Sequence, residues 1–224
     1  MSEDLRPGRG LRIGLGVALL LAVALLVGAG VLLSRPGGAS VPVPAADSVD
    51  VGFAQDMSVH HQQAAEMAAI ARQRSPEETV RQLAFDIETS QLTQIGRMSG
   101  WLSLWNQPEL PPGSLMRWMA SGAGHGQHGT SNATGTTRMP GMATAEELRR
   151  LRSATGREFD VLFLQLMIRH HQGGAPMLEE GAERAGTAQV RNLAQQMLTS
   201  QTAEVETMVK MLATRGGQPL PAPV

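Results

Sequence analysis

Two pairs of adjacent histidines are the residues of this sequence whose types and spacing could do chemistry. Each pair follows a methionine by three and four positions; the residues are Met57, His60, His61, Met167, His170 and His171. On an α-helix, residues three or four positions apart share a face, so a thioether and an imidazole could contact the same ion. Sulfur and imidazole without a carboxylate favour copper, and Cu(I) especially, over Mg²⁺, Ca²⁺ or Mn²⁺. The spacing therefore predicts a copper site.

The two sets are equivalent parts of an internal duplication. A shift of the sequence by 110 positions aligns Asp50 with Asp160, and the alignment continues without a gap to Leu102, which falls on Leu212. Four of the six histidines occupy equivalent positions in the two copies. A repeat of this kind has to be interpreted before any single element, because each copy is one structural unit.

A second candidate for metal binding lies between the copies. Residues 107–143 are rich in Gly, Pro, Ser and Thr, as is typical of a flexible connector, yet they also contain His125, His128, Met139 and Met142. Such a segment could take up an ion without a preformed site. The alternative is a low-complexity loop in which these side chains are incidental.

Helical periodicity places both histidine pairs on long helices. Apolar residues recur at helical spacing from 48 to about 74, and a second helix follows to about 106, with Ser75 as the expected N-cap. The second copy predicts helices over 160–184 and 187–214, and Thr144 with Glu147 forms a capping-box pattern before a short helix. Neither hairpin can bury its apolar face alone, so we expect an antiparallel four-helix bundle with pseudo-two-fold symmetry. Pro176 lies inside the third long helix and should kink it.

Composition excludes several classes of protein. The net charge of −1 provides no field that would attract nucleic acid, and the absence of Cys leaves neither disulfides nor thiolate metal sites. A di-iron oxidase needs bridging carboxylates and a Glu-x-x-His pair, and no histidine here has Glu three positions before it. We recognise no catalytic constellation.

The N-terminal region has the pattern of a membrane anchor. Residues 13–33 form an uncharged apolar run long enough to span about 30 Å as a helix, after a short tail, 1–12, that contains three arginines. The positive-inside tendency places that tail in the cytoplasm and everything beyond a linker at 34–47 outside, as a single-pass membrane protein. A cleaved secretory signal is the competing interpretation. Residues 48–214 form the duplicated domain, and 215–224 form a tail.

The repeated motifs resemble a known family. The pattern FxxxM followed by HHQ, present twice, together with MPGM before a capped short helix, is similar to the family called domain of unknown function 305. The resemblance covers about residues 50–214. It implies a ferritin-like fold and copper binding or copper resistance in a secreted or membrane-anchored protein. The residues implied as ligands are Met57, His60, His61, Met139, Met142, Met167, His170 and His171.

The sequence thus favours a membrane-anchored, extracytoplasmic protein of copper homeostasis or resistance. Two other functions remain open: a structural or partner-binding bundle without metal, and a haem-binding bundle with Met and His as axial ligands. The sequence indicates no particular protein partner and leaves homo-oligomerisation open.

Overall fold

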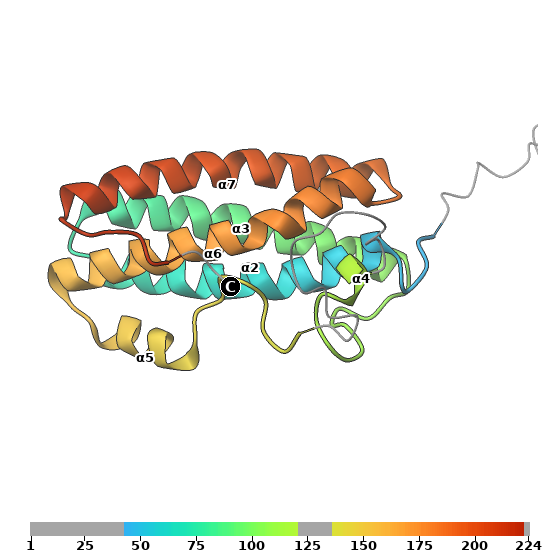
Figure 1. The fold of residues 1–224 in the computed structure, drawn as a ribbon, viewed down its shortest axis with the longest axis horizontal. Helices are drawn as coiled ribbons and strands as arrows, with labels where there is room; N and C mark the ends of the chain where they lie inside the picture. The colour runs from blue at the N-terminus through green and yellow to red at the C-terminus, as the bar shows by residue number, and fades with distance from the viewer. Residues whose placement is uncertain (1–42, 121–135, 222–224) are drawn as a thin grey trace, which may run out of the picture. The chain divides into compact units, whose positions relative to one another are not determined.

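Two helical hairpins form most of the structure of the described residues. The computed structural model describes residues 43–120 and 136–221. The first hairpin consists of α2 (Val49–Arg74) and α3 (Glu78–Leu104), and the second of α6 (Gly156–Arg184) and α7 (Ala188–Thr214). The hairpins meet along α2 and α6, which run in opposite directions (Figure 1). The described residues are helical or irregular and contain no strand, which confirms the predicted all-helical class.

Two short helices lie outside the hairpins. They are α4 (Arg117–Ala120) and α5 (Ala145–Ser153). The predicted capping box at the start of α5 is present, since the Thr144 hydroxyl accepts from the amide of Glu147 and the Glu147 carboxylate accepts from the amide of Thr144. Within the described ranges no helix is both long and apolar enough to cross a membrane. The predicted span, 13–33, lies outside those ranges.

The expected helix start at Ser75 is wrong. Ser75 is the C-terminal cap of α2, and α3 begins only at Glu78, with Glu77 in the N-cap position. The Ser75 hydroxyl accepts from the amide of Glu77 at 3.1 Å and donates to Asp160 on the other hairpin. Ser75 therefore connects the loop before α3 to the other hairpin. The second-copy start at Thr187 is confirmed, because its hydroxyl accepts from the amide of Val190. Helix α6 continues through Pro176.

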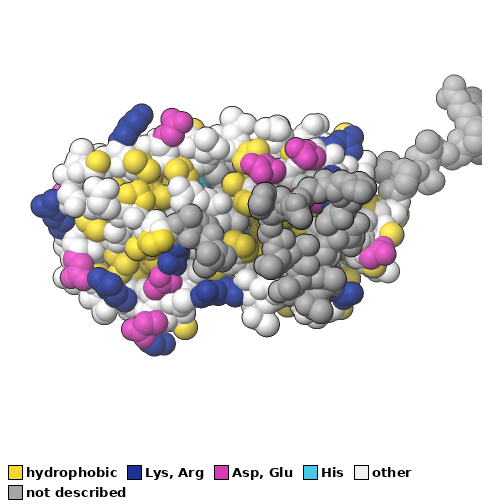
Figure 2. Space-filling view, viewed as in Figure 1, with side chains coloured by type: hydrophobic (Ala, Val, Ile, Leu, Met, Phe, Trp, Pro, Cys, Tyr) yellow, Lys and Arg dark blue, Asp and Glu magenta, His cyan; other side chains and the backbone are white. Residues whose placement is uncertain are grey.

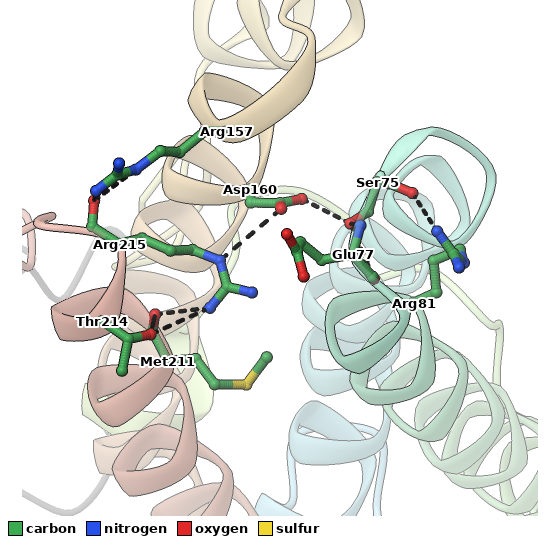
Figure 3. Close-up of polar contacts among 8 residues, drawn as sticks. All are labelled: Ser75, Glu77, Arg81, Arg157, Asp160, Met211, Thr214 and Arg215. Carbon is green, nitrogen blue, oxygen red and sulfur yellow. Dashed lines mark hydrogen bonds and ion pairs between the residues drawn. The ribbon is translucent and has the colours of Figure 1, made fainter.

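Each hairpin is fastened by an aspartate of the other copy. At the start of α2, Asp50 accepts from the amides of Gly186 and Thr187 at 2.7 and 2.8 Å, and from the Thr187 hydroxyl at 2.7 Å. At the start of α6, Asp160 accepts from the Ser75 hydroxyl at 2.6 Å (Figure 3). The two aspartates are equivalent in the repeat, so the same joint occurs at both ends of the α2–α6 contact.

The second joint is less complete than the first. The repeat position equivalent to Gly186 is Pro76, which has no amide hydrogen to donate. Oδ2 of Asp160 is consequently buried without a hydrogen-bond partner, and the nearest cation, Nε of Arg215, lies 3.8 Å away (Figure 3). Burial raises the pKa of Asp160, because desolvation disfavours its charged form.

We therefore expect equivalent substitutions at the two joints to differ in cost. Asp50→Asn places an amide group against backbone N–H donors and should lower the free energy of unfolding by about 2–3 kcal/mol. Asp160→Asn keeps the acceptor for Ser75 and removes a poorly compensated buried charge, so its effect should stay below about 1 kcal/mol. Urea unfolding of both variants measures the difference. Equal losses would show that Pro76 does not weaken the second joint.

Candidate metal centre

The first histidine of each pair lies where the hairpins cross. The rings of His60, on α2, and His170, on α6, are both buried, with centroids 3.9 Å apart. Nε2 of His170 lies 3.1 Å from the carbonyl oxygen of His60, and Nε2 of His60 lies 3.2 Å from that of Pro140. A carbonyl only accepts hydrogen bonds, so each Nε2 carries the proton and Nδ1 has the lone pair.

The second histidine of each pair faces its own hairpin. Nε2 of His61 lies 2.8 Å from the amide oxygen of Gln94 on α3, and Nε2 of His171 lies 2.7 Å from a carboxylate oxygen of Glu204 on α7. Adjacent helical residues point about 100° apart, which is why one histidine of a pair reaches the crossing while the other reaches the neighbouring helix. Gln94 and Glu204 are themselves equivalent positions of the repeat.

The second histidine of each pair has a buried ring nitrogen without a hydrogen-bond partner. Nδ1 of His61 and Nδ1 of His171 are buried and have no hydrogen-bond partner, and the same holds for both amide atoms of Gln91 on α3. A buried polar atom without a partner costs about 1–3 kcal/mol, so such atoms rarely occur without a reason. The lone pair of a neutral imidazole Nδ1 is a metal ligand. The donor set therefore fits a soft or borderline metal ion.

The repeat methionines divide between two core clusters instead of gathering at one point. Met57 and Met98 belong to one buried cluster, with Met177 from the other hairpin. Met167 and Met208 belong to the other cluster, with Met67. All six thioether side chains are fully buried. The structure thus brings His60 and His170 together but places Met57 and Met167 apart, and in the described residues no three His, Asp or Glu side chains surround a common ion position.

Burial keeps the imidazoles of His60, His61 and His170 neutral. Desolvation lowers the pKa of His60 to about 4 and that of His61 to about 3, and it lowers the pKa of His170 well below the usual value. Protons therefore do not compete for their lone pairs at neutral pH, which is the protonation state that a metal ligand requires. In the space-filling view only traces of histidine reach the face shown (Figure 2).

Residues Met139–Met142, which we call the MPGM segment, lie against the histidine crossing. The carbonyl of Pro140 is the partner of His60, and Met139 is buried while Met142 is half-buried. Gln63 holds the next residue, Ala143, by donating to its carbonyl and accepting from its amide. The repeat position equivalent to Gln63 is Gly173, and its missing side chain lets the segment approach α6.

The MPGM segment also borders a surface pocket of about 530 Å³. Met139 and Met142 line this pocket with Glu147 and Arg169. Arg169 donates two hydrogen bonds to the Glu147 carboxylate, at 2.8 and 2.7 Å, and these lower the pKa of Glu147 to about 2. The pair is permanently charged, so it fixes α5 to α6 beside the segment. His125 and His128 lie outside the described residues.

A side chain at Gly173 should displace the MPGM segment. A Cβ there would overlap the backbone of Pro140 and Gly141, and neither can retract as a flexible side chain would. We expect Gly173→Ala to lower the free energy of unfolding by about 1–3 kcal/mol. Gly96→Ala is the matched control, because a Cβ at this helical glycine meets no atom within 4 Å and alanine should stabilise by about 1 kcal/mol. Thermal unfolding distinguishes them; a neutral Gly173→Ala would mean that the segment does not pack closely on α6.

Sequence reasoning missed the residues that hold the histidines. Gln94, Glu204 and the carbonyl of Pro140, which contact the histidines, come from other parts of the chain. One signal was available: Gln94 and Glu204 each lie 33 positions after their histidine, an offset that the repeat preserves. The spacing alone did not show that the second helix of the hairpin places this polar side chain beside the histidine.

Comparisons with known proteins identify the family. The sequence model called domain of unknown function, DUF305, matches residues 50–212. The chain belongs to the DUF305 family. This confirms the resemblance inferred from the HHQ and MPGM motifs. A comparison with curated proteins gives no match.

Solved structures agree with the DUF305 assignment. A presumed secreted DUF305 protein from Streptomyces coelicolor is 43% identical, with a TM-score of 0.69, over 79% of this chain and 99% of that one. A DUF305 fragment from Deinococcus radiodurans is 33% identical, with a TM-score of 0.59, over 74% and 96% of the chains. CopM in its Cu(I)-bound form is 23% identical, with a TM-score of 0.55, over 75% and 98%. The last likeness concerns the fold alone.

Proposed function

We propose that this chain is an extracytoplasmic protein that binds Cu(I) inside its DUF305 domain. The observation that carries the proposal is the pair of buried imidazoles, His61 and His171, whose Nδ1 atoms have no partner. Each lies one helical turn after a buried methionine, Met57 or Met167. Thioether sulfur and neutral imidazole suit Cu(I). An ion bound beside each imidazole would satisfy its unpaired nitrogen.

The donor set disfavours hard divalent ions. Mg²⁺ and Ca²⁺ require several oxygen ligands, and in the described ranges no cluster of carboxylates and imidazoles is arranged to supply them. A carboxylate does lie behind His171, but Glu204 accepts a hydrogen bond from Nε2, so it orients the ring instead of facing the free nitrogen. The function that this chemistry supports is sequestration or transfer of copper, with the ion as cargo.

Solved structures of related proteins also support the proposal. CopM, which shares the fold, has been solved with Cu(I), Cu(II) and Ag bound. The more similar Streptomyces coelicolor relative is a presumed secreted protein, which agrees with an extracytoplasmic domain. In our proposal, residues 13–33 anchor the domain to the membrane, 34–47 tether it, and His125 and His128 with the MPGM segment collect metal ions between the repeats.

The test of copper binding is metal analysis of the purified full chain without a histidine tag. Cu(I), added in the presence of a reductant, should bind and raise the melting temperature, while Mg²⁺ and Mn²⁺ should not. Absence of any Cu(I)-dependent change, with full folding by circular dichroism, would leave the structural bundle as the function. A visible absorption band in the purified protein would instead favour haem.

The anchor requires a separate experiment. Protease added to intact spheroplasts should remove the domain while residues 13–33 remain with the membrane. Complete protection would contradict the proposed topology, and a mature protein that begins beyond residue 34 would identify a cleaved signal.

A further inference from the structure

In each hairpin the second histidine of the pair contacts one polar side chain of the neighbouring helix, and the two polar side chains differ in charge. Gln94 lies behind His61, and Glu204 lies behind His171, at distances of 2.8 and 2.7 Å from Nε2. Both imidazoles are buried, and both have an unpaired Nδ1. The amide of glutamine is neutral, whereas glutamate supplies a carboxylate, so two equivalent positions of the duplication differ in charge.

We propose that the hairpins carry two non-equivalent Cu(I) half-sites and that Glu204, as a positioning residue behind His171, makes the second half-site load first. The first half-site is His61 with Met57 and Met98, and the second is the repeat-equivalent set of His171 with Met167 and Met208. The inference rests on the proposed function and adds the order of binding to it.

The half-sites are separate because their histidines face different helices. His61 contacts α3 and His171 contacts α7, and the rings of His60 and His170, tilted by 36° to each other, lie between the hairpins. The methionines divide in the same way. Met57 and Met98 share one core cluster, while Met167 and Met208 share the other. Met98 lies one helical turn after Gln94, and Met208 lies one turn after Glu204, so in each half-site both helices contribute a thioether.

The carboxylate changes ligand strength in two ways. A carboxylate that accepts the Nε2–H of histidine fixes the ring, keeps the lone pair on Nδ1 and raises the basicity of the ligand. It also compensates the charge of a monovalent ion, which would otherwise be buried without a counterion. Glu204 is only 23% exposed, so water screens this interaction little. Gln94 can fix its ring in the same orientation but cannot neutralise the ion.

The experiment follows each imidazole by NMR while Ag(I), a redox-inactive substitute for Cu(I), is added to the full chain. Nitrogen-15 signals of His171 should shift at lower Ag(I) than those of His61. Glu204→Gln should weaken the first binding event by about 10–100-fold, as is usual for loss of a carboxylate behind a metal-bound histidine. The exchange variant with Gln94→Glu and Glu204→Gln should reverse the order, so that His61 shifts first. A purely structural role for Glu204 would not reverse it.

Glu206→Gln controls for the general loss of a negative charge on α7, because Glu206 is exposed and contacts none of the four bundle histidines. Competition with a chromophoric Cu(I) chelator repeats the comparison with copper itself. An unchanged order in the exchange variant, or simultaneous shifts of His61 and His171 in the parent, would overturn the inference while leaving copper binding intact. No shift of any bundle histidine would overturn the proposed function as well.

Discussion

Replacing the four bundle histidines together should abolish the stabilisation of the domain by Cu(I). The variant carries His60→Gln, His61→Gln, His170→Gln and His171→Gln. Glutamine retains an amide donor that can reach the carbonyl oxygen of Pro140, but its amide nitrogen is not a copper ligand. At a hundredfold excess over the dissociation constant, bound metal stabilises the parent by about 2.7 kcal/mol, which for a domain of this size corresponds to roughly 5–10 °C in melting temperature. Calorimetry with and without Cu(I) measures the loss.

The matched control changes only the loop between the repeats. A variant with His125→Gln and His128→Gln should keep the full Cu(I)-induced rise in melting temperature, even if it binds fewer ions in total. The reverse result, in which the bundle variant binds like the parent and the loop variant binds nothing, would assign the metal to the loop. If both variants behave like the parent, the repeated histidines are structural. The melting temperature of each variant without metal shows whether it has folded.

Acid should destabilise the domain without metal, because folding buries His60 and His61 in their neutral form. In the unfolded chain His60 and His61 take up protons near pH 6.5, whereas in the folded domain the pKa values are about 4 and about 3. Between these values the unfolded state binds more protons, so stability falls as the pH falls. Each imidazole should cost about 2 kcal/mol between pH 7.5 and pH 5.

Two aspartates oppose this trend. Burial raises the pKa of Asp56 and of Asp160, so the folded state gains protons on these groups more readily than the unfolded chain and gains stability as the pH falls. Three imidazoles with lowered pKa values, those of His60, His61 and His170, act against these two carboxyl groups, so we expect the loss of stability to dominate between pH 7.5 and 5. Chemical unfolding at intervals of half a pH unit measures the slope. A stability that does not change over this interval would contradict the neutral, buried state of the imidazoles.

The sequence by itself determined the elements and their repetition. The 110-residue offset predicts two equivalent hairpins, and helical periodicity predicts α2, α3, α6 and α7 to within a few residues, because both signals are local or follow directly from self-comparison. The capping box at Thr144 was also predictable, since a side chain and an amide three residues apart meet in any helix start. The family motif HHQ identified the region that the structure buries.

Only the tertiary structure decided what each of these side chains faces. Helical spacing placed Met57 beside both His60 and His61, but the crossing of α2 and α6 pairs His60 with His170 and turns His61 toward Gln94. The same crossing divides the methionines between two core clusters and brings Pro140 to His60. It also places the Ser75 hydroxyl where it donates a hydrogen bond to Asp160. These contacts join residues that are 33 to 110 positions apart in the sequence. Their formation depends on the relative height and angle of packed helices, which a local period of 3.6 residues does not specify.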